Sequence, residues 1–189
     1  MPKLGMEPIR RDALVKATIH EIGAAGTLDV TVSQIARRAG VSSALAHHYF
    51  GGKDQIFLAA MREILREFGA EVRAALRTAK GPRQRLQAIV TASFAPSCFD
   101  QPVICAWMRF YARAHEDAGA RRLLEIYQAR LRSNLTHAFR PLTDHPEAAA
   151  QTLAALIDGL YLRAALGDGA DHARDTALAL ADRLAELHP

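Results

Sequence analysis

Small hydrogen-bonding side chains are concentrated in one stretch of the chain, SSALAHHYFGGK, which covers residues 42–53. Hydroxyl, imidazole and ammonium groups can bind phosphate oxygens and the edges of bases, and the methyl group of Ala44 can contact the methyl of thymine. A helix whose outer face carries only small groups also fits into the major groove of DNA. The stretch therefore predicts a helix that contacts DNA; the alternative is an ordinary helical hairpin within a core.

Two short helices are expected to hold these groups in place. Thr31 is a suitable N-cap for the first helix, and Gln34 three residues later completes a capping box. Gly40 suits the left-handed residue that ends this helix, and Ser42 caps the second. Each helix has about eight residues, fewer than the ~12 needed for stability alone in water, so neighbouring helices must support both. This pattern predicts a helix-turn-helix.

The two faces of these helices have different predicted roles. The apolar faces should be buried, and they consist of Ile35, Ala36, Ala39, Leu45, Ala46, Tyr49 and Phe50. Lys53 is expected to bind a phosphate, and Tyr49 either does the same with its hydroxyl or simply packs. A metal site at His47 and His48 is disfavoured, because adjacent residues point to different sides of a helix. The complete set of predicted DNA-binding residues is Thr31, Ser42, Ser43, Ala44, His47, His48, Tyr49 and Lys53.

The charge distribution agrees with a nucleic-acid partner for the first part of the chain. Residues 1–53 contain seven Lys and Arg against four Asp and Glu, whereas the remaining 136 residues contain seventeen against sixteen. Arg10 and Arg11 either attract DNA electrostatically or form a solvated face. The two cysteines, Cys98 and Cys105, form neither a disulfide framework nor a metal site, and no signal peptide or membrane span is evident. We expect a cytoplasmic protein without a cofactor.

The rest of the 189-residue chain also reads as helical. Ala, Leu and Arg are plentiful, and no strand-like alternation persists, so we expect an all-α fold of about nine helices. The expected domains are a helix-turn-helix domain over residues 1–53 and a helical effector-binding and dimerisation domain over 54–189, bridged by a helix at 53–78. No phosphate-binding loop or catalytic triad pattern is evident, so an enzyme is not expected.

The first 53 residues resemble the TetR family of bacterial repressors. The resemblance is carried by TVSQIARRAGVS (residues 31–42), by Tyr49-Phe50 and by Lys53, and the length and helix count extend it over the whole chain. Ala44 and His47 differ from the Gly and Tyr of many members. A narrower resemblance, to the Bet-type repressors of choline-to-glycine-betaine genes, is carried by MPKLGM, QIARRAGVS, HYF, RLQAIV and LAALIDGLYLRAAL. The resemblance implies a homodimer that binds a palindromic operator and is controlled by a choline-like effector.

Aromatic residues in the second half of the chain are the candidates for effector binding. Trp107 and Tyr111 lie four residues apart on one helix face, and aromatic faces attract quaternary ammonium ions. A carboxylate inside an apolar helix, Asp158, would complete such a cage, unless Arg109 or Arg163 pairs with it instead. Ordinary core packing of the aromatic residues is the alternative. The full set of predicted effector residues is Trp107, Phe110, Tyr111, Tyr127, Asp158 and Tyr161.

The last two predicted helices, at about 147–166 and 171–187, are candidates for the dimer interface. Both are rich in Ala and carry leucines at helical spacing, so the pair can pack against its twin as a four-helix interface. Packing within one chain is the alternative. The leucines expected at the interface are Leu156, Leu160, Leu178, Leu180 and Leu184.

Overall fold

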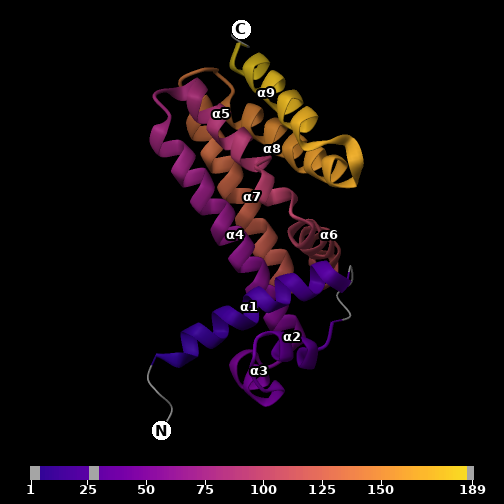
Figure 1. The fold of residues 1–189 in the computed structure, drawn as a ribbon. Helices are drawn as coiled ribbons and strands as arrows, with labels where there is room; N and C mark the ends of the chain where they lie inside the picture. Colours follow the sequence, from indigo (N-terminus) through magenta and orange to yellow (C-terminus); the bar gives the residue numbers. More distant parts are fainter. Residues whose placement is uncertain (1–4, 26–29, 187–189) are drawn as a thin grey trace. The chain divides into compact units, whose positions relative to one another are not determined.

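The computed structural model describes residues 5–25 and 30–186, and its regular structure within these ranges is entirely helical (Figure 1). The predicted all-α fold is confirmed, with nine α-helices in the described part of the chain. Their bounds are α1 Met6–Ala25, α2 Val32–Arg38, α3 Ser43–Phe50, α4 Lys53–Thr78, α5 Pro82–Ser93, α6 Gln101–Glu116, α7 Ala118–Phe139, α8 Pro146–Arg163 and α9 Ala170–Glu186. A 3₁₀-helix, η1 (Pro96–Phe99), precedes α6, and a π-helical turn, η2 (Ala164–Asp168), follows α8.

The breaks between helices follow local chemistry that is visible in the sequence. Pro82 and Pro146 each lie in the first turn of their helices. Backbone N–H groups in a first turn have no acceptor within the helix, so a proline, which lacks the N–H, costs no hydrogen bond there. Asp117 alone separates α6 from α7, and its carboxylate accepts a hydrogen bond of 2.7 Å from the backbone N–H of Ala120. Gly169, with a φ of +86°, precedes α9. Glycine often follows the last residue of a helix, which makes Gly26 a candidate for the end of α1, but Gly26 lies outside the described residues.

Contacts divide the chain into two compact units, and the first comprises residues 1–65 and 100–121. Within it α1 packs against α2 and α6, and α2 packs against α3. Helices α1 and α6 approach closely at Gly23, where an added Cβ would lie 2.5 Å from the Cα of Pro102. The largest fully buried side chains of this unit are Leu14, Ile22, Ile35, Ile56, Met61 and Phe110.

The second unit comprises residues 66–99 and 122–189. Helix α9 packs against α5 and α8 through four alanines spaced four residues apart, Ala173, Ala177, Ala181 and Ala185, all of which are buried. The core beneath them contains Ile89, Val90, Leu135, Phe139, Leu153 and Ile157. The domain boundary expected after residue 53 stays a prediction; the unit that holds the helix-turn-helix extends along α4 to residue 65 and also includes α6.

Candidate DNA-binding surface and effector region

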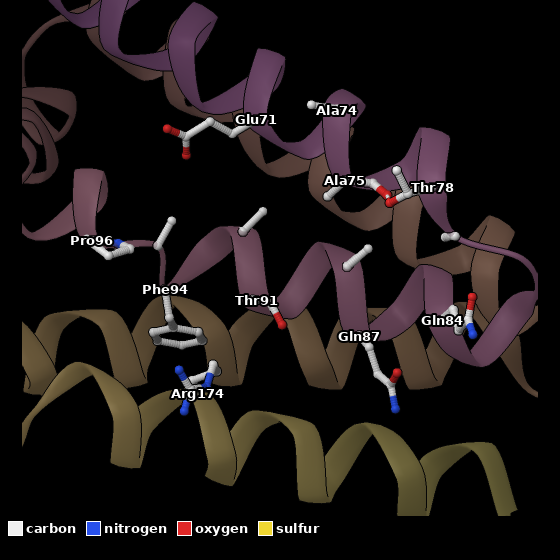
Figure 2. A pocket seen from close by; sticks show the side chains of 14 residues that line it. Glu71, Ala74, Ala75, Thr78, Gln84, Gln87, Thr91, Phe94, Pro96 and Arg174 are labelled. Carbon is white, nitrogen blue, oxygen red and sulfur yellow. Dashed lines mark hydrogen bonds between the residues drawn. The ribbon is translucent and has the colours of Figure 1, made fainter.

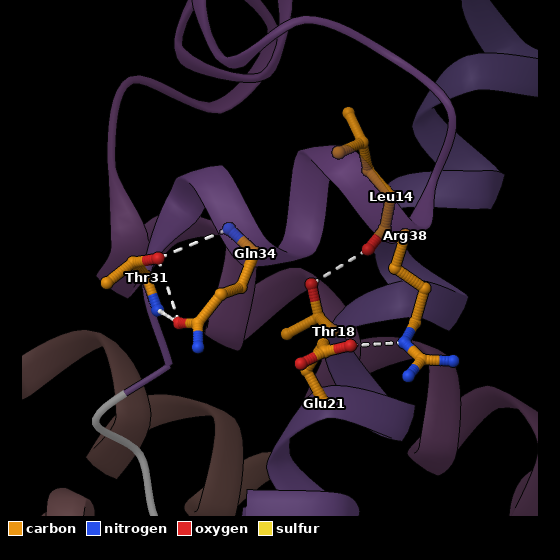
Figure 3. Close-up of polar contacts among 6 residues, drawn as sticks. All are labelled: Leu14, Thr18, Glu21, Thr31, Gln34 and Arg38. Carbon is orange, nitrogen blue, oxygen red and sulfur yellow. Dashed lines mark hydrogen bonds and ion pairs between the residues drawn. The ribbon is translucent and has the colours of Figure 1, made fainter.

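The first helix of the helix-turn-helix is capped as the sequence predicts. The backbone N–H of Gln34 donates to the Thr31 hydroxyl at 3.2 Å, and the Gln34 side chain accepts from the backbone N–H of Thr31 at 2.7 Å (Figure 3). This reciprocal pair is a capping box, and it satisfies two backbone donors that the helix leaves unpaired. The prediction that Thr31 and Gln34 start α2 is therefore confirmed.

The turn and the start of the second helix also agree with the prediction. Gly40 has a φ of +68°, the left-handed conformation that glycine adopts without steric cost. The Ser42 hydroxyl accepts a hydrogen bond of 3.2 Å from the backbone N–H of Leu45 and caps α3. The turn therefore fixes the direction in which α3 leaves α2.

The predicted buried face of the helix-turn-helix is confirmed only in part. Ile35, Ala36 and Ala46 are buried, with exposures of 1%, 1% and 0%. Leu45, Tyr49 and Phe50 are only half-buried, so the expectation that Phe50 belongs to the core is wrong. Because α3 has only eight residues, the aromatic rings at its C-terminal end stay partly open to solvent.

The opposite face of α3 is exposed and contains no acidic residue. Ser42, Ala44, His47 and His48 are all exposed, and Lys53 is exposed at the first residue of α4. Ser43 is half-buried, and its hydroxyl donates to the Ser33 hydroxyl at 3.2 Å. This face therefore offers hydroxyl, imidazole and ammonium groups, whose chemistry suits phosphates and base edges.

A contact between α1 and α3 was not anticipated from the sequence. Arg11 donates a hydrogen bond of 2.8 Å from Nη1 to the backbone carbonyl of Tyr49. The same guanidinium lies 5.1 Å from the ring centroid of Tyr49 and 5.3 Å from that of Phe50. It also pairs with Glu7 at 2.8 Å. Arg11 therefore supports the C-terminal end of the predicted DNA-reading helix, a role that no short-range sequence spacing would reveal.

Ionic contacts join the neighbouring helices to this motif. Arg38 of α2 pairs with Glu21 of α1, beside a buried hydrogen bond of 2.8 Å from the Thr18 hydroxyl to the Leu14 carbonyl (Figure 3). Arg113 of α6 pairs with Asp54 of α4 at 2.7 Å. The two short helices are therefore held by α1, and the start of α4 is held by α6, in line with the expectation that neighbours must support them.

Three of the six predicted effector residues lie together on α6 in the first unit. Trp107 and Phe110 are buried, with exposures of 7% and 0%, and their ring centroids are 5.7 Å apart at an edge-to-face angle of 71°. Tyr111 is half-buried, and its ring centroid also lies 5.7 Å from that of Trp107. The aromatic group predicted from its spacing does form, and most of its surface is packed inside the unit.

The other three predicted effector residues lie in the second unit. The Tyr127 hydroxyl donates to Asp158 Oδ1 at 3.2 Å. The buried Tyr161 donates to the backbone carbonyl of Cys98 at 2.9 Å, and its burial, together with the charge of Cys98, raises the pKa of Tyr161. Arg163, suggested as a partner of Asp158, pairs instead with Asp168 at 2.7 Å.

A cavity of about 630 Å³ in the second unit was not foreseen from the sequence. It lies between α4 and α5, beside η1, and Arg174 of α9 lies near Phe94 at one end (Figure 2). The Glu71 side chain points into it, and Glu71 Oε1 accepts a hydrogen bond of 2.8 Å from Ser97, whereas Oε2 is buried without a hydrogen-bond partner. None of the six predicted effector residues lines this cavity.

The predicted interface leucines are half-buried in this single chain. Leu156 and Leu160 of α8, and Leu178, Leu180 and Leu184 of α9, keep part of their surface open, whereas the alanine row of α9 faces inward. Ala155 and Gly159 beside the α8 leucines are exposed, and Leu166 in η2 is 81% exposed. The two helices therefore leave a partly apolar outer face.

Neither a metal site nor a membrane-spanning helix is found among the described residues. Within residues 5–25 and 30–186, no group of three or more His, Cys, Asp or Glu side chains could hold a metal ion. Among the same residues, the helices are too short or too polar to cross a membrane.

Comparisons with known proteins agree for both parts of the chain. Residues 14–60 match the tetR family of bacterial regulatory proteins, and residues 82–188 match the C-terminal domain of BetI-type transcriptional repressors. The HTH-type transcriptional regulator BetI of Brucella anthropi is 50% identical over 187 residues, which cover 98% of this chain and 96% of that protein.

Solved structures share the fold. A transcriptional regulator of Pseudomonas aeruginosa PAO1 is 28% identical, with a TM-score of 0.78 over 97% of this chain and 93% of that one. A transcriptional regulator of Saccharomonospora viridis, solved in complex with choline, is 22% identical, with a TM-score of 0.84 over 93% of this chain and 97% of that one.

Proposed function

Because this chain belongs to the TetR family of bacterial regulatory proteins and has a BetI-type repressor C-terminal domain, it is a DNA-binding transcriptional repressor, and we propose that it controls choline and glycine-betaine genes. Its molecular role is regulatory and not enzymatic. The specific proposal is a cytoplasmic homodimer that binds a palindromic operator and responds to choline or a similar quaternary ammonium ion. One observation carries the DNA-binding part of this proposal: the capped helix-turn-helix exposes a polar face on α3 that has no acidic residue.

The proposed operator contacts come from both ends of α3. The backbone N–H groups at its start and the hydroxyls of Ser42 and Ser43 suit phosphates, and His47 is the residue proposed to contact bases. His48, Lys53 and Tyr49 serve as phosphate contacts on the flanks, with Thr31 at the start of α2 on the same DNA. Because the Tyr49 ring lies under the Arg11 guanidinium, its hydroxyl is the part of that side chain assigned to DNA.

The proposed homodimer uses the outer face of α8 and α9. Half-buried leucines beside the exposed Ala155 and Gly159 permit close helix packing, and burying the exposed Leu166 would remove a large apolar side chain from water. A two-fold dimer presents two copies of α3, and these must be about 34–36 Å apart, or a multiple of that spacing, to reach successive major grooves. Sedimentation velocity is the direct test of the dimer.

The proposed effector class rests on the BetI-type domain and on the chemistry of the predicted residues. The relative from Saccharomonospora viridis was solved with choline, which supports this class for a fold of the same type. Asp158 supplies a carboxylate that accepts a hydrogen bond from Tyr127, and Tyr127 and Tyr161 supply aromatic faces for a cation. The alternative is an unrelated small hydrophobic or cationic effector, for which the cavity beside Glu71 provides room.

The experiment is fluorescence anisotropy of a labelled DNA fragment from upstream of the gene for this protein. It is done at fixed salt, with and without millimolar choline. Tight binding that choline weakens supports the repressor and the effector together, because a ligand that prefers another spacing of the two heads lowers DNA affinity. Tight binding that choline leaves unchanged selects the alternative effector. The absence of specific binding at any salt concentration would overturn the proposal for this operator.

A further inference from the structure

A second cavity, of about 460 Å³, lies in the second unit where α5 begins and α7 ends. Its lining contains three basic side chains and no acidic one, together with a glycine and two prolines: Gly81, Pro82, Arg85, His137, Arg140 and Pro141. Guanidinium groups stay charged at every pH at which proteins fold, so this cavity has a positive charge of at least two. None of its residues belongs to the helix-turn-helix or to the predicted effector set.

The basic groups of this cavity are not neutralised by the protein. Within residues 5–25 and 30–186, Arg85, His137 and Arg140 make no ion pair, and Arg85 Nε is buried without a hydrogen-bond partner. Most buried donors in proteins are paired, so an unpaired guanidinium nitrogen calls for an explanation. Arg85 as a whole is half-buried, and its side chain makes no hydrogen bond to the part of the chain that the structure describes, so its guanidinium can bind an anion.

Arg83, two residues earlier on the same helix, shows the usual arrangement for comparison. Its guanidinium lies 3.8 Å from Asp182 and 3.9 Å from Glu186, two carboxylates on α9. Arg83 therefore has two carboxylate partners, whereas Arg85 has none among the described residues. This difference between neighbours leaves the guanidinium of Arg85 available to an anion from outside the chain.

The start of α5 adds to the positive potential. Gly81 is the N-cap of this twelve-residue helix, and no side chain caps its first backbone N–H groups. Such N–H groups and the helix dipole favour an anion. With two guanidinium groups and an imidazole, the donors match the several oxygens and the double charge of a phosphate group better than a single carboxylate.

We infer that this cavity, defined by Arg85, His137 and Arg140, binds a phosphate group, either free or carried as a monoester on a small organic molecule. Small-molecule sites occupy roughly 300–1,000 Å³, so the cavity has room for a phosphate group and an organic part packed against Pro82 and Pro141. The site is independent of the operator and of the proposed choline response. The repressor then has a second ligand site, whose ligand is an anion, whereas the proposed choline-like effector is a cation.

The test is isothermal titration calorimetry of the purified full-length protein with inorganic phosphate and with phenyl phosphate, in HEPES buffer at constant ionic strength. We expect saturable binding of one ligand per chain. Arg85→Gln and Arg140→Gln should each weaken it about tenfold or more, because each removes a charge-assisted contact. Arg83→Gln is the matched control: it removes the same charge from the same helix, and binding should stay within about twofold.

The outcomes separate the sources and decide the inference. Tighter binding of phenyl phosphate assigns the site to an organic phosphate, and equal affinities assign it to free phosphate; both support it. No saturable binding of either ligand up to about 10 mM would overturn it. So would an Arg83→Gln variant that loses as much affinity as Arg85→Gln, because binding would then reflect net charge alone. Circular dichroism verifies that each variant is folded.

Discussion

Arg11 of α1 donates a hydrogen bond of 2.8 Å to the carbonyl of Tyr49, in the last turn of α3. The last carbonyls of a helix have no partner within it, so this contact satisfies a group that α3 itself leaves open. Because the guanidinium also covers the rings of Tyr49 and Phe50, one side chain fixes the far end of the helix proposed to read the operator.

Replacing Arg11 tests whether it positions α3 or binds DNA itself. We expect Arg11→Ala to weaken operator binding about tenfold, since a hydrogen bond to a charged donor contributes about 1.5–3 kcal/mol when it is not fully solvated. A positioning role leaves the slope of log affinity against log salt unchanged, whereas loss of a phosphate contact lowers it by about one. Arg10→Ala, its neighbour, is the control. A shallower slope for Arg11→Ala would contradict the positioning role.

Lys53, unlike Arg11, is expected to bind DNA directly, so its replacement should change the salt dependence of binding. Lys53→Ala should weaken binding to all DNA sequences alike and reduce the salt slope by about one, because a phosphate contact releases a counterion and carries no base information. Anisotropy titrations on operator and scrambled DNA at several salt concentrations measure both effects. Lys80→Ala, an exposed lysine outside the motif, should change neither. If Lys53→Ala alters only the preference for the operator, its assignment to phosphate is wrong.

The capping box at Thr31 has a predicted effect on stability. Thr31→Ala should lower the free energy of unfolding by about 1 kcal/mol, because it removes the acceptor for the Gln34 N–H. Thr31→Ser keeps the hydroxyl and should recover most of the loss. Urea unfolding followed by circular dichroism measures the difference. Equal stability of the Ala and Ser variants would show that the hydroxyl does not stabilise α2.

Asp158 is the predicted counter-ion of a cationic effector. Asp158→Asn should abolish the effect of choline on operator binding and leave binding without choline unchanged, because the carboxamide has no charge for the ammonium ion. Asp168→Asn is the matched control, since it removes a carboxylate whose partner is Arg163. Anisotropy with increasing choline compares the two variants. A normal choline response of Asp158→Asn would exclude this residue from the effector site.

Tyr161 should make the free energy of unfolding fall as the pH becomes alkaline. Burial raises its pKa in the folded state above the unfolded value of about 10, so folding favours the protonated hydroxyl. Its stabilising contribution is complete below about pH 10 and falls above it, by up to about 1.4 kcal/mol per pH unit. Urea unfolding at several alkaline pH values should show a steeper decline for the native chain than for Tyr161→Phe. Parallel declines would contradict this.

Sequence reasoning was most successful where the controlling interaction is local. The capping box joins residues three apart, and the left-handed Gly40 depends on its own backbone, so both were predictable and both are confirmed. The contact between Arg11 and Tyr49 joins residues thirty-eight apart and depends on the path of α1. No periodicity encodes such a contact, and the half-burial of Phe50 escaped prediction for the same reason.

In the effector region, too, the sequence predicted local contacts and missed those between separate helices. The spacing of Trp107 and Tyr111 correctly placed both rings on one helix face. Which carboxylate would lie beside which arginine depends on the packing of separate helices, and Arg163 in fact pairs with Asp168 in the adjacent turn. The cavity beside Glu71 could not be predicted from the sequence, because six of its fourteen lining residues are alanines, and alanines at this spacing are typical of any packed helix.

The four buried alanines of α9 have a consequence for how the position of this helix is specified. Their spacing of four residues means that a shift of one turn, about 6 Å along the axis, brings each methyl group to the place its neighbour has left. A row of identical small groups therefore holds α9 close without selecting its register, unlike interlocking side chains of different shapes. Features that do differ between registers lie at the two ends of α9: the short link through Gly167 and Gly169, both with positive φ, precedes the helix, and Asp182 and Glu186 pair with Arg83 near its C-terminal end.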